Sequence, residues 1–231
     1  MLWKLVVGFC IASAIAEVVL IASPRITDFG EWGQYEECPP GMFVYGFQMK
    51  VEPFQGQAWY DDTALNAIYL LCVPPAYRRD TYEFLSQDPS TRAFAKISSL
   101  EGDRGYFRAV WECPHGFFAK GFELKSAKAR GWAYDDTAAN NMKLLCTNGL
   151  LMEGDGEKDG NWTGLQTCPR TLLVCGIQTQ VELAATDLTM LNNFTHGCYR
   201  VKQRQLGMLP AKCYTNKLIK YHVYIISFVE F

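Results

Sequence analysis

Long apolar runs, charged residues and nucleotide-binding motifs are all scarce in this sequence. Charged residues make up 20% of the 231 residues and hydrophobic residues 49%, a composition that excludes a disordered chain. The first apolar stretch is interrupted by Glu17, well short of the roughly 20 apolar residues that a membrane-spanning helix needs. The sequence has no phosphate-binding Gly-Lys-Ser/Thr run, no Gly-x-Ser-x-Gly elbow and no dinucleotide fingerprint. These absences argue against the classes of protein that depend on such features.

Histidine is also rare, and positive charge does not dominate. The three histidines, His115, His196 and His222, share no spacing with a second type of metal ligand, so we expect no metal site and no cofactor. Residues 17–198 carry 15 basic side chains (22, less Lys4 and six after residue 198) and 23 acidic ones (24, less Glu230), a net charge of −8. Because such a surface repels phosphate backbones, we expect no nucleic-acid partner.

The amino terminus has the pattern of a secretory signal peptide. Residues 1–16, MLWKLVVGFCIASAIA, place one lysine before a short apolar run that ends on Ala14-Ile15-Ala16. This pattern predicts cleavage after Ala16. We therefore expect a secreted, extracellular protein without a membrane attachment after cleavage.

Cysteine is abundant, and cleavage would leave an even number. The chain has nine cysteines, and removal of Cys10 with the signal peptide leaves eight of these nine. An even set in a secreted chain is typical of a disulfide framework. Two Asn-x-Thr sequences, at Asn161 and Asn193, are potential glycosylation sites in the same compartment.

The sequence contains a threefold internal repeat, which is aligned on Cys38, Cys113 and Cys168. Each of these cysteines follows a glycine by eight positions and an aromatic residue by six, and each is followed directly by proline. The aromatic residues are Trp32, Phe107 and Trp162. Units of this length cannot each bury a hydrophobic face, so we expect the three to share one core.

We therefore expect a single domain over residues 17–198. Its repeats are about 28–72, 105–146 and 160–198, and residues 73–104 form an insertion and linker. Residues 199–231 hold six basic residues and one glutamate and end on an apolar run. They are either a genuine tail outside the repeats or an altered end of the chain.

The repeats are predicted to be β-strands joined by polar turns. In GFQMKVE, residues 46–52, Phe47, Met49 and Val51 alternate with polar residues, which predicts a strand with one buried face. The phrase YDDTALNAIYLLC at 60–72 returns as YDDTAANNMKLLC at 134–146 and in degenerate form at 187–198. Since Asp, Thr and Asn hydrogen-bond nearby backbone in turns, each copy predicts a turn that leads into a core strand. The predicted fold class is all-β.

The recurring cysteines suggest a pairing. An opening and a closing cysteine in each repeat favour the disulfides Cys38–Cys72 and Cys113–Cys146. By analogy Cys168 pairs with Cys198, which leaves Cys175 for Cys213. Other pairings among these last four cysteines are equally compatible with the sequence.

Five stretches together resemble the vitelline membrane outer layer protein I family, in order and in spacing. They are CPPGMFVYGFQMKVEPFQG, DDTALNAIYLLC, CPHGFFAKGFELK, DDTAANNMKLLC and CPRTLLVCGIQTQVE, and the similarity covers roughly residues 28–198. The resemblance implies a β-prism, in which three antiparallel Greek-key sheets surround a pseudo-threefold axis and are stapled by disulfides. It also implies an extracellular egg-coat component with links to carbohydrate and a transferase-like activity on chitin-type oligosaccharides.

Three positions depart from the pattern of that family. Phe107 stands where the family usually has tryptophan, Leu188 replaces the second Asp of the third turn, and Tyr199 replaces a second cysteine after Cys198. The third repeat has therefore lost an acid, which favours a binding or structural role over catalysis.

Carboxylates are the only side chains available as a catalytic acid and base. Glycoside hydrolysis needs two carboxyl groups across a sugar cleft. Their recurrence at equivalent positions favours turn structure, because one active site would not need three copies. Candidates for ligand binding come from the aromatic positions and the third turn, although regular spacing favours packing of the aromatic residues in the core or between repeats. The candidate acids and bases are Asp61, Asp62, Asp135, Asp136, Glu52 and Glu182, and the ligand-binding candidates are Trp32, Trp162 and Asp187.

The sequence thus favours a secreted, disulfide-bonded structural or glycan-binding component of an extracellular coat or secretion. Its expected partners are extracellular glycans or coat proteins. The alternative is a carbohydrate-active enzyme, a transferase or hydrolase on chitin-type oligosaccharides. A β-trefoil lectin, which is also threefold, is disfavoured by the opening and closing cysteines of each repeat.

Overall fold

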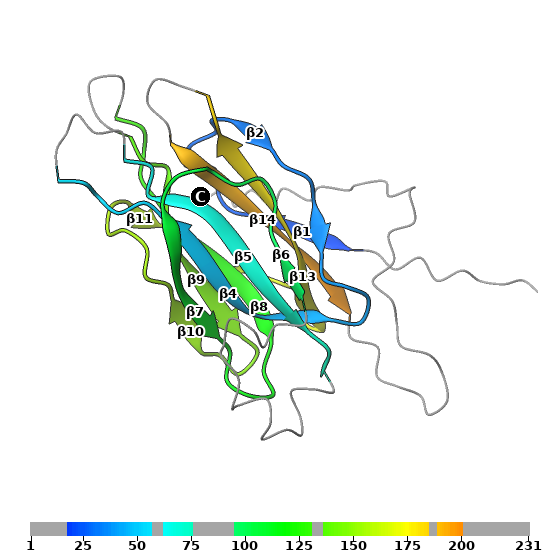
Figure 1. Ribbon diagram of the computed structural model, residues 1–231. Coiled ribbons are helices and arrows are strands. Elements are labelled where there is room, and N and C mark those ends of the chain that lie inside the picture. The colour runs from blue at the N-terminus through cyan, green and yellow to red at the C-terminus, as the bar shows by residue number, and fades with distance from the viewer. Residues whose placement is uncertain (1–17, 57–61, 76–94, 131–135, 185–188, 201–231) are drawn as a thin grey trace, which may run out of the picture.

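The computed structural model describes residues 18–56, 62–75, 95–130, 136–184 and 189–200. Their regular structure consists of fourteen β-strands (Figure 1). Within these ranges, no helix has the length and apolar character needed to cross a membrane. The chain is all-β, as its alternating pattern predicts.

The strands form three antiparallel sheets, which we name A, B and C. Sheet B contains β4 (Phe43–Val51), β5 (Leu65–Val73), β6 (Ala95–Ile97) and β7 (Tyr106–Glu112). Sheet C contains β8 (Ala119–Ser126), β9 (Ala139–Cys146), β10 (Leu151–Glu153), β11 (Asn161–Trp162) and β12 (Gln166–Thr167). Sheet A contains β1 (Val19–Ala22), β2 (Glu31–Trp32), β3 (Glu36–Glu37), β13 (Leu172–Glu182) and β14 (Met190–Arg200).

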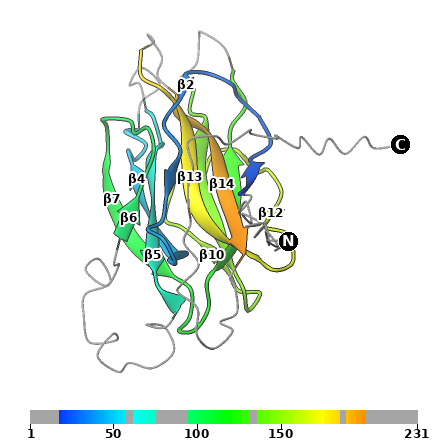
Figure 2. The same ribbon diagram turned by 90° about the vertical axis from the view of Figure 1, so that its right-hand side faces the viewer.

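Each sheet is a Greek key built around one long hairpin. The strand orders are β6-β5-β4-β7, β10-β9-β8-β11 and β1-β14-β13-β2, so a third strand lies beside the second and a fourth lies beside the first. The hairpins surround a common interior, which Figures 1 and 2 show from two directions. The architecture is the β-prism with pseudo-threefold repeats that the resemblance implied.

The first strands of each repeat pair with the hairpin of the preceding repeat. β7 pairs with β4, β11 and β12 pair with β8, and β2 and β3 pair with β13. Because β2 lies near the start of the chain and β13 near its end, this pairing closes a ring. At each step the N–H of the opening cysteine donates to a carbonyl of the preceding hairpin. These bonds are Cys38 N to Cys175 O at 2.7 Å, Cys113 N to Tyr45 O at 2.7 Å and Cys168 N to Lys120 O at 2.8 Å.

Three disulfides connect neighbouring sheets. They join Cys38–Cys72, Cys113–Cys146 and Cys168–Cys198, which are the pairings expected from the repeat. Each opening cysteine follows a short strand of one sheet, and each closing cysteine lies in the hairpin of the next. A disulfide that closes a loop of this size contributes about 2–4 kcal/mol. Cys175 is buried, but Cys213 lies outside the described residues, so their pairing stays a prediction.

The segment 73–104, expected to be an insertion and linker, contributes a strand to the body of the protein. β6 forms the edge of sheet B beside β5, and β10 and β1 hold the equivalent places in sheets C and A. Strands of three or four residues are too short to show a period, so the sequence did not reveal them. Residues 76–94 lie outside the described part of the chain.

Side chains from all three hairpins meet in the main core. Phe47, Met49 and Val51 are fully buried, as the period-two pattern predicts. The rings of Phe122 in β8 and Phe194 in β14 form an edge-to-face contact between two sheets, with centroids 4.2 Å apart. Burial of each such side chain contributes about 1.5–3 kcal/mol. The repeats therefore share one core, which none of them could form alone.

A glycine begins the first strand region of each repeat because the chain there lies directly on the preceding hairpin. Gly105 has a φ of +74°, and a Cβ atom on it would overlap the backbone of Val51 and Glu52. Gly30 and Gly160 have φ values of +80° and equivalent contacts. The ring of strand pairs therefore requires glycine at these positions.

Substitution of Gly105 by alanine tests this close approach. Gly116 offers a matched control, since its φ is +86° but a Cβ on it would have nothing within 4 Å. Both variants adopt a left-handed backbone that costs about 1–2 kcal/mol with a side chain. Gly105→Ala should cost about 1–3 kcal/mol more because of overpacking. The free energy of unfolding of the oxidised protein, measured by denaturant titration, checks this; equal losses in both variants would contradict it.

Candidate functional site

The repeated phrase forms the same turn three times at one end of the prism. In each copy, the side-chain amide of an asparagine donates two hydrogen bonds. One goes to the hydroxyl of the threonine three residues earlier, and the other goes to the backbone carbonyl of the residue that follows this threonine. All of these threonines and asparagines are buried. The Nδ2-to-Oγ1 distances are 2.7 Å for Asn66 and Thr63, 2.9 Å for Asn140 and Thr137 and 2.8 Å for Asn192 and Thr189. The phrase is thus a turn, as predicted.

Two of the predicted acids or bases belong to these turns. Glu52 Oε2 accepts hydrogen bonds from the Thr63 N–H at 3.1 Å and from its hydroxyl at 2.7 Å. Glu182 Oε2 accepts the equivalent pair from Thr189 at 3.2 and 2.7 Å. In both places the carboxylate fixes the turn that follows its own strand.

The described aspartates also accept hydrogen bonds from turn backbone. Asp62 Oδ2 accepts from the Gln55 N–H at 3.1 Å. Asp136 accepts from the Arg130 N–H at 2.8 and 2.9 Å and lies 3.3 Å from the Arg130 guanidinium. Both aspartates are buried. Asp61, Asp135 and Asp187 lie outside the described residues, so the predictions for them stay predictions.

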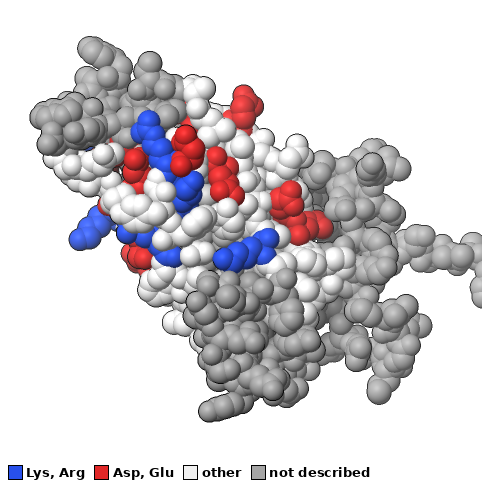
Figure 3. All heavy atoms as spheres, viewed as in Figure 1, with Lys and Arg blue, Asp and Glu red and all other residues white. Residues whose placement is uncertain are grey.

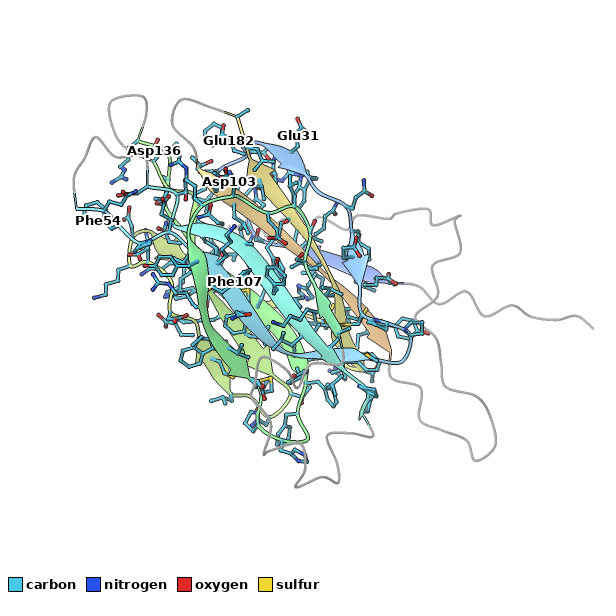
Figure 4. The ribbon with its side chains drawn as sticks, viewed as in Figure 1. Glu31, Phe54, Asp103, Phe107, Asp136 and Glu182 are labelled. Atoms are coloured by element: carbon cyan, nitrogen blue, oxygen red, sulfur yellow. A yellow bond between two sulfur atoms is a disulfide. The ribbon has the colours of Figure 1, made fainter. Side chains whose placement is uncertain are left out.

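The predicted carboxylates that the structure describes lie at one end of the prism, and each accepts hydrogen bonds there. Figure 4 shows Asp136 and Glu182 at the hairpin-turn end, with Glu31 and Asp103 nearby. A catalytic acid and base must face a substrate across a cleft. The described candidates instead hold their own turns in place, which favours the structural interpretation of this acidic end.

The repeated aromatic residues lie on the outer faces of the sheets. Trp32 pairs with Gln180, Phe107 with Lys50 and Trp162 with Lys125. Phe107 is 49% exposed, and the Lys143 ammonium lies 3.7 Å from the centre of the Trp162 ring. The aromatic residues thus lie where one repeat pairs with the next, which is one of the two kinds of packing predicted for them. Ligand binding by Trp32 and Trp162 stays a prediction. Because each aromatic residue holds the same place in a strand pair, the three recur at the same position of the repeat although they are not in the core.

The outer face of sheet B holds an aromatic pair next to a polar network. The rings of Tyr69 and Phe107 meet edge to face with centroids 5.0 Å apart, and Phe107 lies over this sheet in Figure 4. Tyr69 donates to Glu101 at 2.5 Å, and Ser98 donates to the same oxygen at 2.9 Å. Burial and the Glu101 carboxylate raise the pKa of Tyr69 to about 12, so its hydroxyl stays protonated.

A groove lies at the junction of sheets A and B. It has a volume of about 400 Å³ and is open to solvent. Ser99 donates to the Gln34 carbonyl at 2.6 Å, so a hydrogen bond joins the two walls. The lining residues are Gly33, Gln34, Glu36, Lys96, Ile97, Ser98, Ser99 and Leu100.

One position of the repeat differs between the junctions of the sheets. Glu36 stands two residues before the opening cysteine, and Trp111 and Gln166 hold the equivalent positions. At the junction of sheets B and C, Trp111 packs against the main core and its indole N–H lies 3.5 Å from Asp155. At the junction of sheets A and B, the exposed Glu36 lines the groove instead. The spacing of residues along the chain does not predict this groove, because its walls come from segments about 60 residues apart.

On the face seen in Figure 3, Lys and Arg side chains lie among Asp and Glu side chains, with no large patch of one sign in the part that is not grey. This face therefore offers no basic surface for a nucleic acid. It is compatible with recognition of neutral polar molecules.

His196 lies in the interior of the third repeat. It is fully buried against Phe122, with ring centroids 4.8 Å apart, and burial lowers the pKa of its imidazole to about 3. A ligand nitrogen of His196 and the sulfurs of Cys168 and Cys198 lie within 4.8 Å of one another. His196 and Cys198 lie two residues apart in β14, and the disulfide brings Cys168, which follows β12 in the neighbouring sheet, to them. The spacing of the histidines alone did not indicate this cluster.

The two potential glycosylation sites differ in their surroundings. Asn161 is exposed at the start of β11. Asn193 is buried in β14, and its side-chain nitrogen donates to the Thr27 carbonyl and to Gln180, both at 2.8 Å. A glycan on that nitrogen is incompatible with this fold, so the expectation of a site at Asn193 is wrong for the folded chain.

Comparison with known proteins agrees with the repeat and the fold. The sequence profile described as vitelline membrane outer layer protein I matches residues 19–201. The chain belongs to this family. Two relatives are named vitelline membrane outer layer protein 1 homolog. The Mus musculus protein is 33% identical over 197 residues, which is 79% of this chain and 89% of the relative. The Homo sapiens protein is 32% identical over 201 residues, 84% and 90% of the two chains.

Solved lectin structures show a distant likeness. Frutapin, a lectin from Artocarpus incisa, gives a TM-score of 0.45 at 12% identity, over 78% of this chain and 97% of its own. Artocarpin, a lectin with mannose specificity, gives 0.47 at 8% identity, over 79% and 98%. Likeness at this level indicates neither a ligand nor an activity for this member of the vitelline membrane outer layer protein I family.

Replacement of Thr63 by valine separates the structural role of the acidic turns from a catalytic one. Valine keeps the shape but removes the hydroxyl that joins Asn66 to Glu52, so the free energy of unfolding should fall by about 1–3 kcal/mol. Thr167→Val, at an exposed position, should change it by no more than about 0.5 kcal/mol. Denaturant titration of both oxidised variants checks this. An unchanged midpoint for Thr63→Val would refute the structural role.

Proposed function

We propose that this family member is a secreted, disulfide-bonded structural and glycan-binding component of an extracellular coat or secretion. Residues 1–16 act as the signal peptide, and the repeats form one domain over residues 17–198. Its partners are extracellular glycans or neighbouring coat proteins, and the mature protein has no membrane attachment. The observation that carries the glycan-binding part is the groove of mixed polar and apolar lining between sheets A and B.

The groove has the chemistry that a neutral saccharide requires. Its lining includes the side chain of Gln34 and the hydroxyl oxygens of Ser98 and Ser99, which donate to Glu101 and to the Gln34 carbonyl and can still accept hydrogen bonds. Ile97 and Leu100 supply apolar surface. Sugar rings present hydroxyls at their edges and C–H groups on their faces, so a mixed lining of this kind complements them. Glu36 and Lys96 add one charge of each sign, which leaves the site without a net preference for charged ligands.

The closed, stapled body supports the structural part of the proposal. Three disulfides tie the sheets together, and such frameworks are typical of proteins that persist outside the cell. The described carboxylates Glu52, Asp62, Asp136 and Glu182 accept hydrogen bonds from their own turns. This arrangement favours binding over the alternative, a transferase or hydrolase on chitin-type oligosaccharides.

We further propose that Asn161 carries the glycan of a glycoprotein. Its side chain is exposed at a sheet edge, whereas that of Asn193 is buried. Peptide mapping of the secreted protein after enzymatic deglycosylation should show conversion to Asp at position 161 and none at position 193. Conversion at position 193 in folded protein would contradict the described burial.

Filling the groove tests the glycan site directly. Glu36→Trp introduces the residue that occupies the equivalent position at the neighbouring junction, so the fold should accept it. We expect the affinity for chitin-type oligosaccharides, measured by calorimetry with the oxidised protein, to fall more than about tenfold, or about 1.4 kcal/mol.

Gln166→Trp is the matched control, since it adds the same side chain at the third equivalent position and should leave the affinity unchanged. Equal affinity in Glu36→Trp and wild type would place binding elsewhere. Mass spectrometry of the oligosaccharides after incubation tests the alternative, because redistribution of chain lengths would show an enzyme. An absence of both binding and products on a broad glycan panel would leave only the structural role.

A further inference from the structure

The third repeat contains a buried histidine where the other two contain leucine. His196 stands two residues before its closing cysteine, and Leu70 and Leu144 hold the equivalent positions. All three side chains are almost completely buried. Leucine therefore satisfies the packing at this position, and the histidine requires another explanation.

The imidazole of His196 has unused ligand capacity. Neither ring nitrogen has a hydrogen-bond partner in the described structure. The rings of Phe122 and Phe194 pack beside it, and phenylalanine side chains have no conventional donor or acceptor. Leaving a buried polar group unpaired costs about 1–3 kcal/mol, so such groups in native proteins often mark a functional requirement.

The sulfurs of the third disulfide lie beside this unpaired nitrogen. The ligand atoms of Cys168, Cys198 and His196 lie within 4.8 Å of one another, and all three residues are buried. A tetrahedral zinc ion, with bonds of about 2.3 Å to sulfur and 2.0–2.1 Å to nitrogen, holds its ligand atoms roughly 3.5–3.8 Å apart. The two sulfurs, 2.09 Å apart in the disulfide, must separate to about 3.8 Å after reduction before these three atoms can hold a single cation.

We propose that the third disulfide can be exchanged for a metal site, in which Cys168, Cys198 and His196 bind zinc after reduction. While the disulfide is intact, the sulfurs are bonded to each other and are not thiolate ligands. A dithiol reductant supplies two electrons and two protons, becomes a disulfide itself and leaves two protein thiols. Zinc then displaces both thiol protons to solvent, and one neutral imidazole nitrogen donates its lone pair.

This chemistry distinguishes one disulfide from the other two. The Cys38–Cys72 and Cys113–Cys146 pairs have Leu70 and Leu144 in place of the histidine. Two thiolates alone form an incomplete site for zinc, which prefers four ligands and accepts three from the protein with one open position. The reduced chain should therefore bind one zinc ion tightly.

Histidine resonances give a direct readout of the site. The chain contains three histidines, so isotope-labelled histidine gives a simple nuclear magnetic resonance spectrum. Full-length protein is reduced with dithiothreitol, freed of it without oxygen and titrated with zinc. We expect one equivalent to shift the imidazole nitrogen signals of His196, with no such shift in the oxidised protein. His196→Leu should weaken binding at least about tenfold, a factor that loss of even an outer partner of a ligand can cause.

A gain of function supplies the matched control. Leu144→His places the same three ligand types beside Cys113 and Cys146, so the reduced variant should bind a second equivalent of zinc. Equal zinc affinity in His196→Leu and wild type would overturn the proposal, since other thiols would then hold the metal. An unshifted His196 signal would overturn it as well. So would circular dichroism showing that the reduced chain is unfolded both with and without zinc, because the site requires the folded sheet.

Discussion

Closure of the ring of strand pairs is the constraint on which this structure depends. Each hairpin receives its fourth strand from the following repeat, and the last hairpin receives its own from the start of the chain. A hairpin alone is marginally stable in water, so the repeats fold as a set. Successive repeats lie in direct backbone contact. The glycine at the start of each repeat allows this close approach, and the N–H of the opening cysteine donates a hydrogen bond across it. The three disulfides then cross the same junctions.

The closed ring also restricts where function can reside. The same pair of threonine and asparagine holds each of the three turns. Four of the described carboxylates, Glu52, Asp62, Asp136 and Glu182, also accept hydrogen bonds in these turns. A site that is specific to one repeat can arise only at positions where the repeats differ in sequence. Glu36 lines a groove at one junction, where Trp111 holds the equivalent position at the next. His196, in place of leucine, puts an imidazole without a hydrogen-bond partner beside one disulfide.

Much of this fold could be predicted from the sequence because the repeat supplies three versions of each pattern. The long strands, their buried faces, the turns and the disulfide partners all follow from equivalent positions. The short strands β1, β6 and β10 could not be predicted, since three or four residues carry no period. The groove and the cluster at His196 were also missed. Both combine residues from separate segments, and single-chain spacing does not reveal which strands become neighbours.

Hydrogen exchange in the double variant Cys38→Ala/Cys72→Ala tests ring closure most directly. This variant removes the disulfide between sheets A and B and leaves sheet C untouched. If the ring is one cooperative unit, the core amides of Leu124 and Leu144 in sheet C should lose as much protection as those of sheets A and B, about 2–4 kcal/mol. Loss confined to sheets A and B, with unchanged exchange in sheet C, would show that the sheets are stabilised independently and would contradict a closed ring.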